Sequence, residues 1–160
     1  MVGRGSLDYS IQIATEADID LIQDLYNHRQ IKSELHWYTY REALERAVRR
    51  QNRDIFYIEA DDSATVIGAS MVWCESRVLA PDQAQVRLIA VHPDYRGRGL
   101  GRDLIDVSEQ YAASFEKDLL VAETASASEA KQFWLAMGFE VVSTRTTDGG
   151  REMTFMKKTI

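Results

Sequence analysis

Residues 86–105 read Val-Arg-Leu-Ile-Ala-Val-His-Pro-Asp-Tyr-Arg-Gly-Arg-Gly-Leu-Gly-Arg-Asp-Leu-Ile. The run 86–91 is apolar and β-branched and is stopped by Pro93, as expected of a strand. From Leu104 onward apolar residues recur with the period of a helix. Three glycines within five positions separate the two elements, so the backbone can turn tightly there and approach a ligand closely. The stretch therefore predicts a strand, a ligand-binding loop and a helix.

The charge of this loop favours an anionic ligand. Residues 95–102 contain Arg96, Arg98 and Arg102 and no acid, within a chain of net charge −6. The first turn of a helix adds unpaired amides and partial positive charge, which together form a phosphate site. The loop is not a Walker A motif, because no Gly-Lys-Ser/Thr follows it. The third glycine of a dinucleotide fingerprint would fall at Arg102, which excludes that motif as well.

The spacing of Arg96, Gly99 and Gly101 resembles the acyl-CoA-binding motif Gln/Arg-x-x-Gly-x-Gly/Ala of the GNAT superfamily of N-acetyltransferases. The preceding Ile-Ala-Val-His-Pro-Asp-Tyr is also typical of that superfamily, as is Phe-Trp-Leu-Ala-Met-Gly-Phe at 133–139. The alternative is a glycine-rich connection between a strand and a helix whose arginines are merely solvated.

Length and composition predict one ordinary globular domain. The chain has 160 residues, of which 45% are hydrophobic and 28% are charged, and these values argue against disorder. We expect a single domain over 9–160, with 1–8 as a disordered leader or as residues added for expression. The N-terminal ten residues have no apolar core and so do not form a signal peptide.

Cysteine usage and charge limit the compartment and the partners. Cys74 stands alone, so no internal disulfide is expected and a cytoplasmic location fits. Its apolar neighbours indicate an inert strand cysteine, with a covalent acyl carrier as the alternative. No apolar run approaches the ~18 residues of a membrane span. The acidic balance argues against nucleic acid as a partner; it suits a cationic amine, although solubility alone explains it.

The remaining pattern predicts an α+β fold with element order β-α-α-β-β-β-α-β-α-β-β. Predicted strands cover 9–13, 54–60, 65–75, 86–91, 117–123, 139–144 and 152–158, and predicted helices cover 15–29, 39–51, 104–115 and 126–137. Residues 30–38 are expected to be irregular, with hairpin turns at 61–63 and 148–150. The sheet is expected to be mixed, largely antiparallel and twisted, with helices on both faces. This order is similar to the GNAT fold from about Tyr9 to Lys158.

The resemblance implies how acetyl-CoA would bind. In the family the two central parallel strands splay, here 86–91 and 117–123, and the pantetheine arm enters between them. Ile89, Ala90 and Val91 would then contact it through their backbone groups. The pyrophosphate would lie on the loop formed by Arg96, Gly97, Arg98, Gly99, Leu100, Gly101 and Arg102. Trp134 would flank the CoA tail, and no metal is expected.

The catalytic groups depart from the family pattern. A primary amine with a pKa near 10.4 must lose a proton before or during attack. Many members carry an acid on the first splayed strand, where Gln85 and Arg87 stand here, and a tyrosine where Trp134 stands. Glu75 and Glu123, both at strand ends, are the candidate bases; each is alternatively a solvated carboxylate, and a water chain could replace both. A backbone amide near 89–91 is the expected oxyanion donor.

Trp37, Tyr38 and Tyr40 are candidate substrate-binding residues, because the helix connection that carries them flanks the acceptor site in the family. A hydrophobic cap on the core is the alternative. The predicted function is direct transfer of acetyl from acetyl-CoA to a primary amine of a small molecule or protein. The rival is a CoA-binding sensor or interaction module without turnover, and a homodimer is compatible with either.

Overall fold

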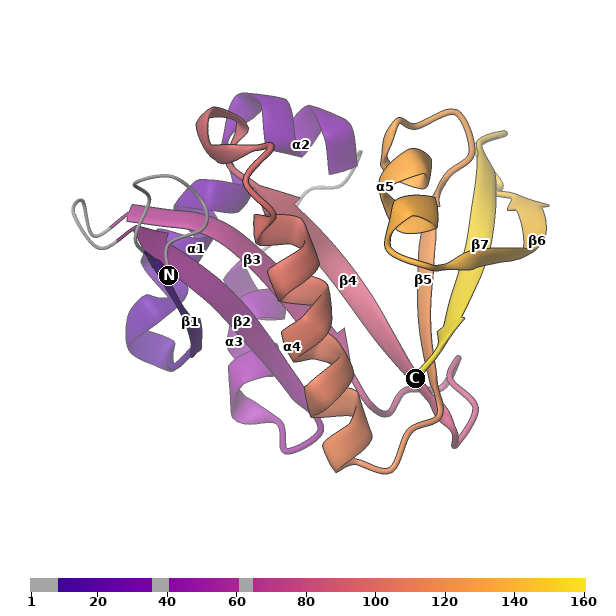
Figure 1. Cartoon of the computed structure of the whole chain (residues 1–160), viewed down its shortest axis with the longest axis horizontal. Helices are drawn as coiled ribbons and strands as arrows, with labels where there is room; N and C mark the ends of the chain where they lie inside the picture. Colours follow the sequence, from indigo (N-terminus) through magenta and orange to yellow (C-terminus); the bar gives the residue numbers. More distant parts are fainter. Residues whose placement is uncertain (1–8, 36–40, 61–64) are drawn as a thin grey trace.

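The strands of the computed structural model form one sheet with the order β1-β2-β3-β4-β5-β7-β6 (Figure 1). The structure describes residues 9–35, 41–60 and 65–160, so the predicted leader 1–8 and the predicted turn at 61–63 lie outside the described residues. The strands are β1 Tyr9–Ile13, β2 Arg53–Ala60, β3 Thr65–Trp73, β4 Gln83–Val91, β5 Leu119–Ala125, β6 Glu140–Thr146 and β7 Glu152–Thr159.

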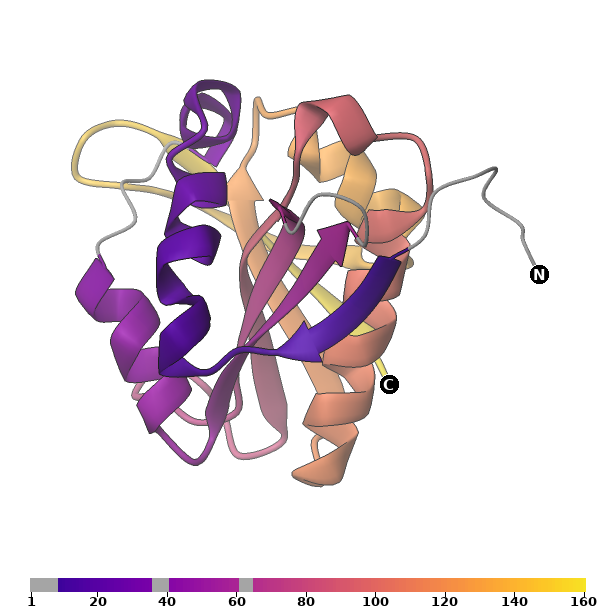
Figure 2. The same ribbon diagram turned by 90° about the vertical axis from the view of Figure 1, so that its left-hand side faces the viewer.

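Helices cover both faces of this sheet. They are α1 Ile19–Tyr26, α2 Arg29–Leu35, α3 Arg41–Arg49, α4 Leu100–Ser114 and α5 Ala130–Ala136, with short 3-10 turns at Glu16–Asp18 and Pro93–Tyr95. Figure 2 shows the sheet between α1 and α3 on one side and α4 on the other. No helix in the described ranges is both long enough and apolar enough to cross a bilayer. The mixed, largely antiparallel α+β fold with helices on both faces is confirmed.

Helix α4 holds the centre of the core because its apolar residues recur on one face. Leu104, Ile105 and Ala112 are almost fully buried against the sheet. Gly68 of β3 allows this approach, since a Cβ there would lie 3.4 Å from Leu104 Cδ1. The one polar residue on this face, Ser108, donates to Leu104 O at 2.7 Å and lies 3.2 Å from Ser70 Oγ. The buried hydroxyls are therefore paired, as burial requires.

The largest difference from the sequence prediction is α2. Residues 30–38 were expected to be irregular, but Arg29–Leu35 is helical, so that prediction was wrong for 30–35, whereas 36–38 lie outside the described residues. Only Ile31 of this helix is buried, so its apolar residues give no helical period. By contrast, the start of the predicted helix 15–29 has a local signal, because the Thr15 backbone amide donates to the Asp18 carboxylate at 2.8 Å beside the 3-10 turn Glu16–Asp18.

The sheet opens between β4 and β5, as the family resemblance implied. These parallel strands pair only over residues 83–85 with residues 119–121. Beyond that point β4 remains paired with β3 as far as Val91, and β5 remains paired with β7 as far as Ala125. The two strands therefore form a V that widens toward their C-terminal ends, as Figure 1 shows.

A β-bulge lies in β4 where the V begins to open. Met71 of β3 pairs with Arg87, but Ala69 pairs with Ala90, so β4 carries one extra residue between these two pairs. Leu88 within the bulge has φ +52°, a backbone conformation that side chains rarely adopt. Bulges bend a strand and redirect its side chains, and they are concentrated near functional sites.

We predict that Leu104→Ala lowers the free energy of unfolding by about 2–5 kcal/mol, because it removes a fully buried side chain between α4 and β3. Urea unfolding monitored by circular dichroism measures this change. The matched control is Val78→Ala, whose side chain is 79% exposed and whose expected effect is about 0.5 kcal/mol or less. Equal effects of the two changes would contradict the assignment of Leu104 to the core.

Candidate functional site

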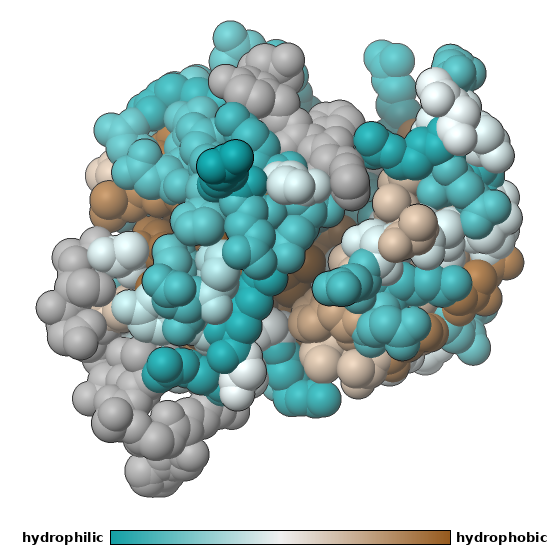
Figure 3. All heavy atoms as spheres, turned by 90° about the horizontal axis from the view of Figure 1, so that it is seen from above, coloured by the Kyte–Doolittle hydropathy of each residue, from teal (hydrophilic) through white to brown (hydrophobic). Residues whose placement is uncertain are grey.

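The candidate site is the open end of the V between β4 and β5. Seen from above in Figure 3, the molecule is hollowed between its two halves, with hydrophobic residues in the depth of the hollow. The edge of β4 that faces β5 has no strand partner beyond Gln85. Ile89, Ala90 and Val91 lie on this edge. Backbone amides and carbonyls need partners when they are shielded from water, so this edge suits an extended ligand that carries amide groups.

The loop that follows β4 is shaped by two glycines in left-handed conformations. Gly97 has φ +79°, and Gly99, the N-cap of α4, has φ +83°. The first amides of α4 then stand at the positive end of a 15-residue helix. Arg98 and Arg102 are exposed beside them. Backbone amides, a helix N-terminus and two exposed cationic side chains together make a site for phosphate groups.

Gly101 sets the close packing at the start of α4. A Cβ at this position would lie 2.7 Å from Cε1 of Phe133 on α5, closer than real contacts allow. The neighbouring side chain of Leu100 is buried in the core, so only its backbone is available to a ligand. Glycine at 101 thus lets α5 pack directly on the first turn of α4.

Arg96 ties the loop to α2. Its guanidinium donates to the two carboxylate oxygens of Glu34 at 2.9 and 2.6 Å, and its Nε donates to Val91 O at 3.0 Å. The hydrogen bond from Arg96 holds the pKa of Glu34 below its usual range, and the same bond raises the pKa of Arg96. The carboxylate is therefore ionised at neutral pH, and the tie is lost only when the pH falls through that lowered pKa. A contact between Arg96 and a pyrophosphate stays a prediction.

The two carboxylates predicted as candidate bases lie at opposite ends of the strands. Glu123 stands two residues beyond Val121, the last residue of β5 that pairs with β4, and so borders the open V. Both of its oxygens accept hydrogen bonds from Arg145 of β6, each at 2.7 Å. Glu75 follows the end of β3 at the closed end of the V and accepts from Asn52 Nδ2 at 3.1 Å. The position of Glu123 suits a base better than that of Glu75.

The predicted aromatic site residues divide into two groups. Trp134 is only 5% exposed, and its ring packs against those of Phe133 and Phe139 with centroids 5.4 and 4.9 Å apart. Its main contacts are thus within the core, and a contact with the cofactor stays a prediction. The predicted acceptor lid of Trp37, Tyr38 and Tyr40 lies outside the described residues.

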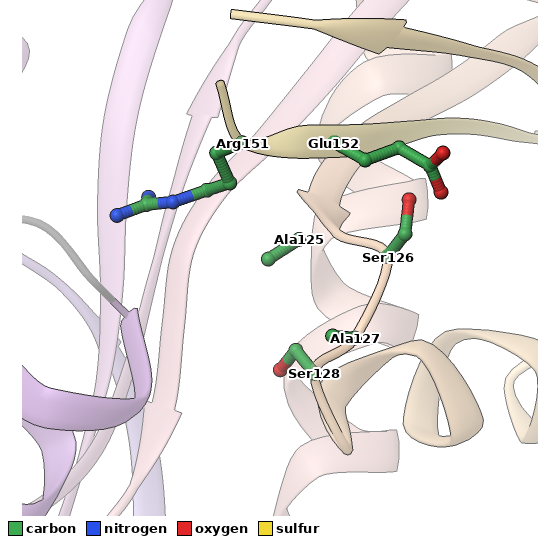
Figure 4. Close-up of a pocket in the computed structure, with 6 residues that line it drawn as sticks. All are labelled: Ala125, Ser126, Ala127, Ser128, Arg151 and Glu152. Atoms are coloured by element: carbon green, nitrogen blue, oxygen red, sulfur yellow. The ribbon is translucent and has the colours of Figure 1, made fainter. Parts of the chain in front are cut away.

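A pocket of about 650 Å³ lies at the C-terminal end of β5, where the V is open (Figure 4). It is lined by Ala125, Ser126, Ala127, Ser128, Arg151 and Glu152. Ser126 Oγ lies 2.6 Å from Thr154 Oγ1, which fixes the loop to β7. Arg151 and Glu152 point to opposite sides in Figure 4, so the arginine is directed away from the carboxylate beside it. None of these lining residues was among the predicted site residues, because only the fold brings the two loops together.

Comparisons with known proteins agree with this geometry. The model of the acetyltransferase (GNAT) domain family matches residues 22–160. The protein yncA of Salmonella typhimurium, described as an acetyltransferase and solved with its cofactor acetyl-CoA, is 22% identical, with a TM-score of 0.77 over 95% of this chain and 94% of that one.

Two further solved structures share the fold at lower identity. The ribosomal-protein-S18-alanine N-acetyltransferase of Escherichia coli is 17% identical, with a TM-score of 0.72 over 96% of this chain and 94% of that one. The spermidine N-acetyltransferase of Vibrio cholerae, in complex with CoA and spermine, is 17% identical, with a TM-score of 0.73 over 94% and 95%. At these identities the likeness concerns the fold.

We predict that Cys74 does not react in the folded protein. Its side chain is 2% exposed, and burial raises the pKa of its thiol to about 11. At pH 8 only roughly one thiol in a thousand would be ionised, and the thiolate is the reactive form. A chromogenic disulfide reagent should therefore label no thiol in the native protein and one thiol in guanidinium. If Cys74 is labelled as fast in the native protein as in the denatured protein, the result would contradict this prediction and support Cys74 as a covalent acyl carrier.

Proposed function

Since the chain belongs to the GNAT acetyltransferase family, we propose that it transfers an acetyl group from acetyl-CoA to a primary amine of a small molecule or protein. The observation that supports this proposal most strongly is the unpaired edge of β4. This edge leads directly into a glycine loop at the N-terminus of α4. The relatives solved with acetyl-CoA and with CoA support the choice of co-substrate. Cytoplasmic location and self-association stay predictions.

The residues of this chain fit acetyl-CoA in two places. The unpaired edge of residues 89–91 offers peptide groups to the amide-rich pantetheine arm. The loop of residues 96–102 offers helix-start amides, with Arg98 and Arg102 exposed beside them, to the phosphates. When bound, acetyl-CoA would supply an activated acetyl group.

Transfer requires the amine to arrive uncharged between the strands. The amine nitrogen forms the new bond to the acetyl carbon while the carbon–sulfur bond breaks, so the amine loses a proton and the thiolate gains one. We assign proton removal to Glu123, directly or through one water, because it borders the open V. Arg145 holds that carboxylate in place through two hydrogen bonds. A backbone amide of residues 89–91 is the donor to the developing negative charge on oxygen.

A CoA-binding module without turnover is the second candidate. It is favoured by Gln85, which stands where many members carry an acid, and by Trp134, which stands where many carry a tyrosine. Incubation with acetyl-CoA and a panel of amines, followed by measurement of released thiol, separates the two. Binding of acetyl-CoA without thiol release for any amine would identify the module.

We predict that Gly99→Glu and Gly101→Glu each abolish acetyl-CoA binding in calorimetric titration. At Gly99 the left-handed backbone becomes strained, and at Gly101 the new side chain collides with Phe133; both changes also place a negative charge among the phosphates. The control is Gly149→Glu in the β6–β7 turn, where the nearest atom to an added Cβ is 3.9 Å away. Retained affinity in the two loop variants, with a native circular dichroism spectrum, would refute the proposed binding mode.

We predict that Glu123→Gln lowers kcat by about a hundredfold, the usual contribution of a positioned general base, and leaves the Kd for acetyl-CoA unchanged. Glu75→Gln is the matched control at the closed end of the V and should leave kcat unchanged. Steady-state kinetics at saturating acetyl-CoA give both values. Unchanged kcat in Glu123→Gln would assign the proton to a water chain instead.

A further inference from the structure

Two arginines enclose a tryptophan on the sheet face that carries α1 and α3. Trp73 of β3 is directly opposite Arg53 of β2 in the strand register, and Arg87 of β4 is its diagonal neighbour. The guanidinium carbon of Arg53 lies 3.6 Å from the centroid of the Trp73 ring, and that of Arg87 lies 4.1 Å from it. The indole Nε1 is in turn 3.1 Å from Met71 Sδ, which fixes the ring. Both cations are thus held in place by an aromatic face.

Neither arginine forms a salt bridge within 4.0 Å among the residues that the structure describes, in a chain with 25 acidic residues and 19 lysines and arginines. Burial lowers the pKa of both groups, and the positive charges of Arg50, Arg87 and Arg46 lower that of Arg53 further. Arg53 Nε is buried without a hydrogen-bond partner, and so is the nearby Gln85 Oε1. Charged groups that are partly removed from water are normally paired, so this half-buried cluster has room for an anionic partner.

The position of Arg87 relates this cluster to the reaction. Gln85 and Val121 are the last residues that pair β4 with β5. Two residues further along each strand stand Arg87 and Glu123, on the same face of the sheet, where the pairing of β4 with β5 has ended. The charge of Glu123 acts on Arg87, which places the two groups near each other. The β-bulge follows Arg87 immediately.

The phosphates of acetyl-CoA do not account for this charge. Arg87 precedes Val91 by four residues, and the phosphate loop begins only after Val91, so roughly 13 Å of strand separates Arg87 from that loop. Arg87 therefore lies at the acceptor end of the site rather than at the nucleotide end.

We propose that the acceptor is a small amine that also carries a carboxylate, such as an amino acid, and that Arg87 binds the carboxylate. This inference rests on the proposed function. The stack on Trp73 orients the guanidinium of Arg87, and Arg53 adds positive charge behind it. Glu123, on the opposite strand, is the base assigned to the amine. An acceptor with both charges complements the opening, because arginine forms two parallel hydrogen bonds with a carboxylate.

The kinetic test compares amines that differ only in the carboxylate: lysine with cadaverine, phenylalanine with phenethylamine, and methionine with 3-(methylthio)propylamine. Thiol release from acetyl-CoA gives kcat and KM for each. For at least one pair, the carboxylate-bearing member should have a kcat/KM about tenfold or more above that of its partner, mainly through KM. Equal values throughout, with turnover present, would overturn the inference and leave the proposed function standing.

Variants separate a binding role of Arg87 from a structural one. Arg87→Gln should raise KM for the preferred carboxylate-bearing amine about tenfold or more, with kcat and the Kd for acetyl-CoA unchanged. It should not change KM for the paired amine that lacks the carboxylate. Arg87→Lys should restore part of the affinity, and Arg77→Gln, in the exposed loop before β4, is the control. Equal loss for both members of a pair would assign Arg87 to structure alone and overturn the inference.

A binding measurement decides the inference if no amine is turned over. The CoA-loaded protein is titrated with N-acetyl-lysine, N-acetyl-phenylalanine and N-acetyl-methionine and with the corresponding N-acetyl amines, and binding is followed by calorimetry and by the indole NH resonance of Trp73. Selective binding of an acid, lost in Arg87→Gln, would support the anion site and disprove the transferase. Absence of any selective binding together with absence of turnover would overturn both proposals.

Discussion

The structure depends on the loss of pairing between β4 and β5 after Gln85 and Val121. Within a sheet, each interior strand normally uses the peptide groups on both of its edges. Here each strand keeps one ladder, β4 with β3 and β5 with β7, and leaves the other edge open. Peptide groups without partners are costly in a buried place, so the opening is stable only where water or a ligand can reach it. The opening is therefore suited to bind an extended ligand that contains amide groups.

The elements around the opening are held by contacts that do not belong to the hydrophobic core. Glu34 and Arg96 connect α2 to the loop after β4, and Glu123 and Arg145 connect β5 to β6. Exposed ion pairs of this kind add little to global stability. Their use is positional: each fixes a charged group at one side of the opening, while the buried side chains of α4 carry the energy of folding.

Patterns within a short stretch of sequence were sufficient for most of the fold. Three elements have sequence signals that can be read without knowing the fold. They are the loop of residues 96–102, the amphipathic helix α4 and the turn before β7. Helix α2 has no such signal, since it is short and buries a single residue, and it is held by an arginine 62 positions away. The same limit applies to the site, because Arg53, Trp73 and Arg87 meet only through strand register. The sequence shows Arg87 as a departure from the family pattern, but no local pattern pairs it with Trp73.

The ion pair of Glu34 and Arg96 links α2 to the loop that follows β4. Arg96 belongs to the loop that we propose binds the acyl donor, whereas Glu34 belongs to α2, which packs on β4 on the opposite face of the sheet from α4. A change in the position of α2 would thus be transmitted to the proposed donor loop. A substitution of Glu34 removes the ion pair that fixes Arg96, unless residue 96 changes as well. Residues 34 and 96 are therefore expected to change together in evolution.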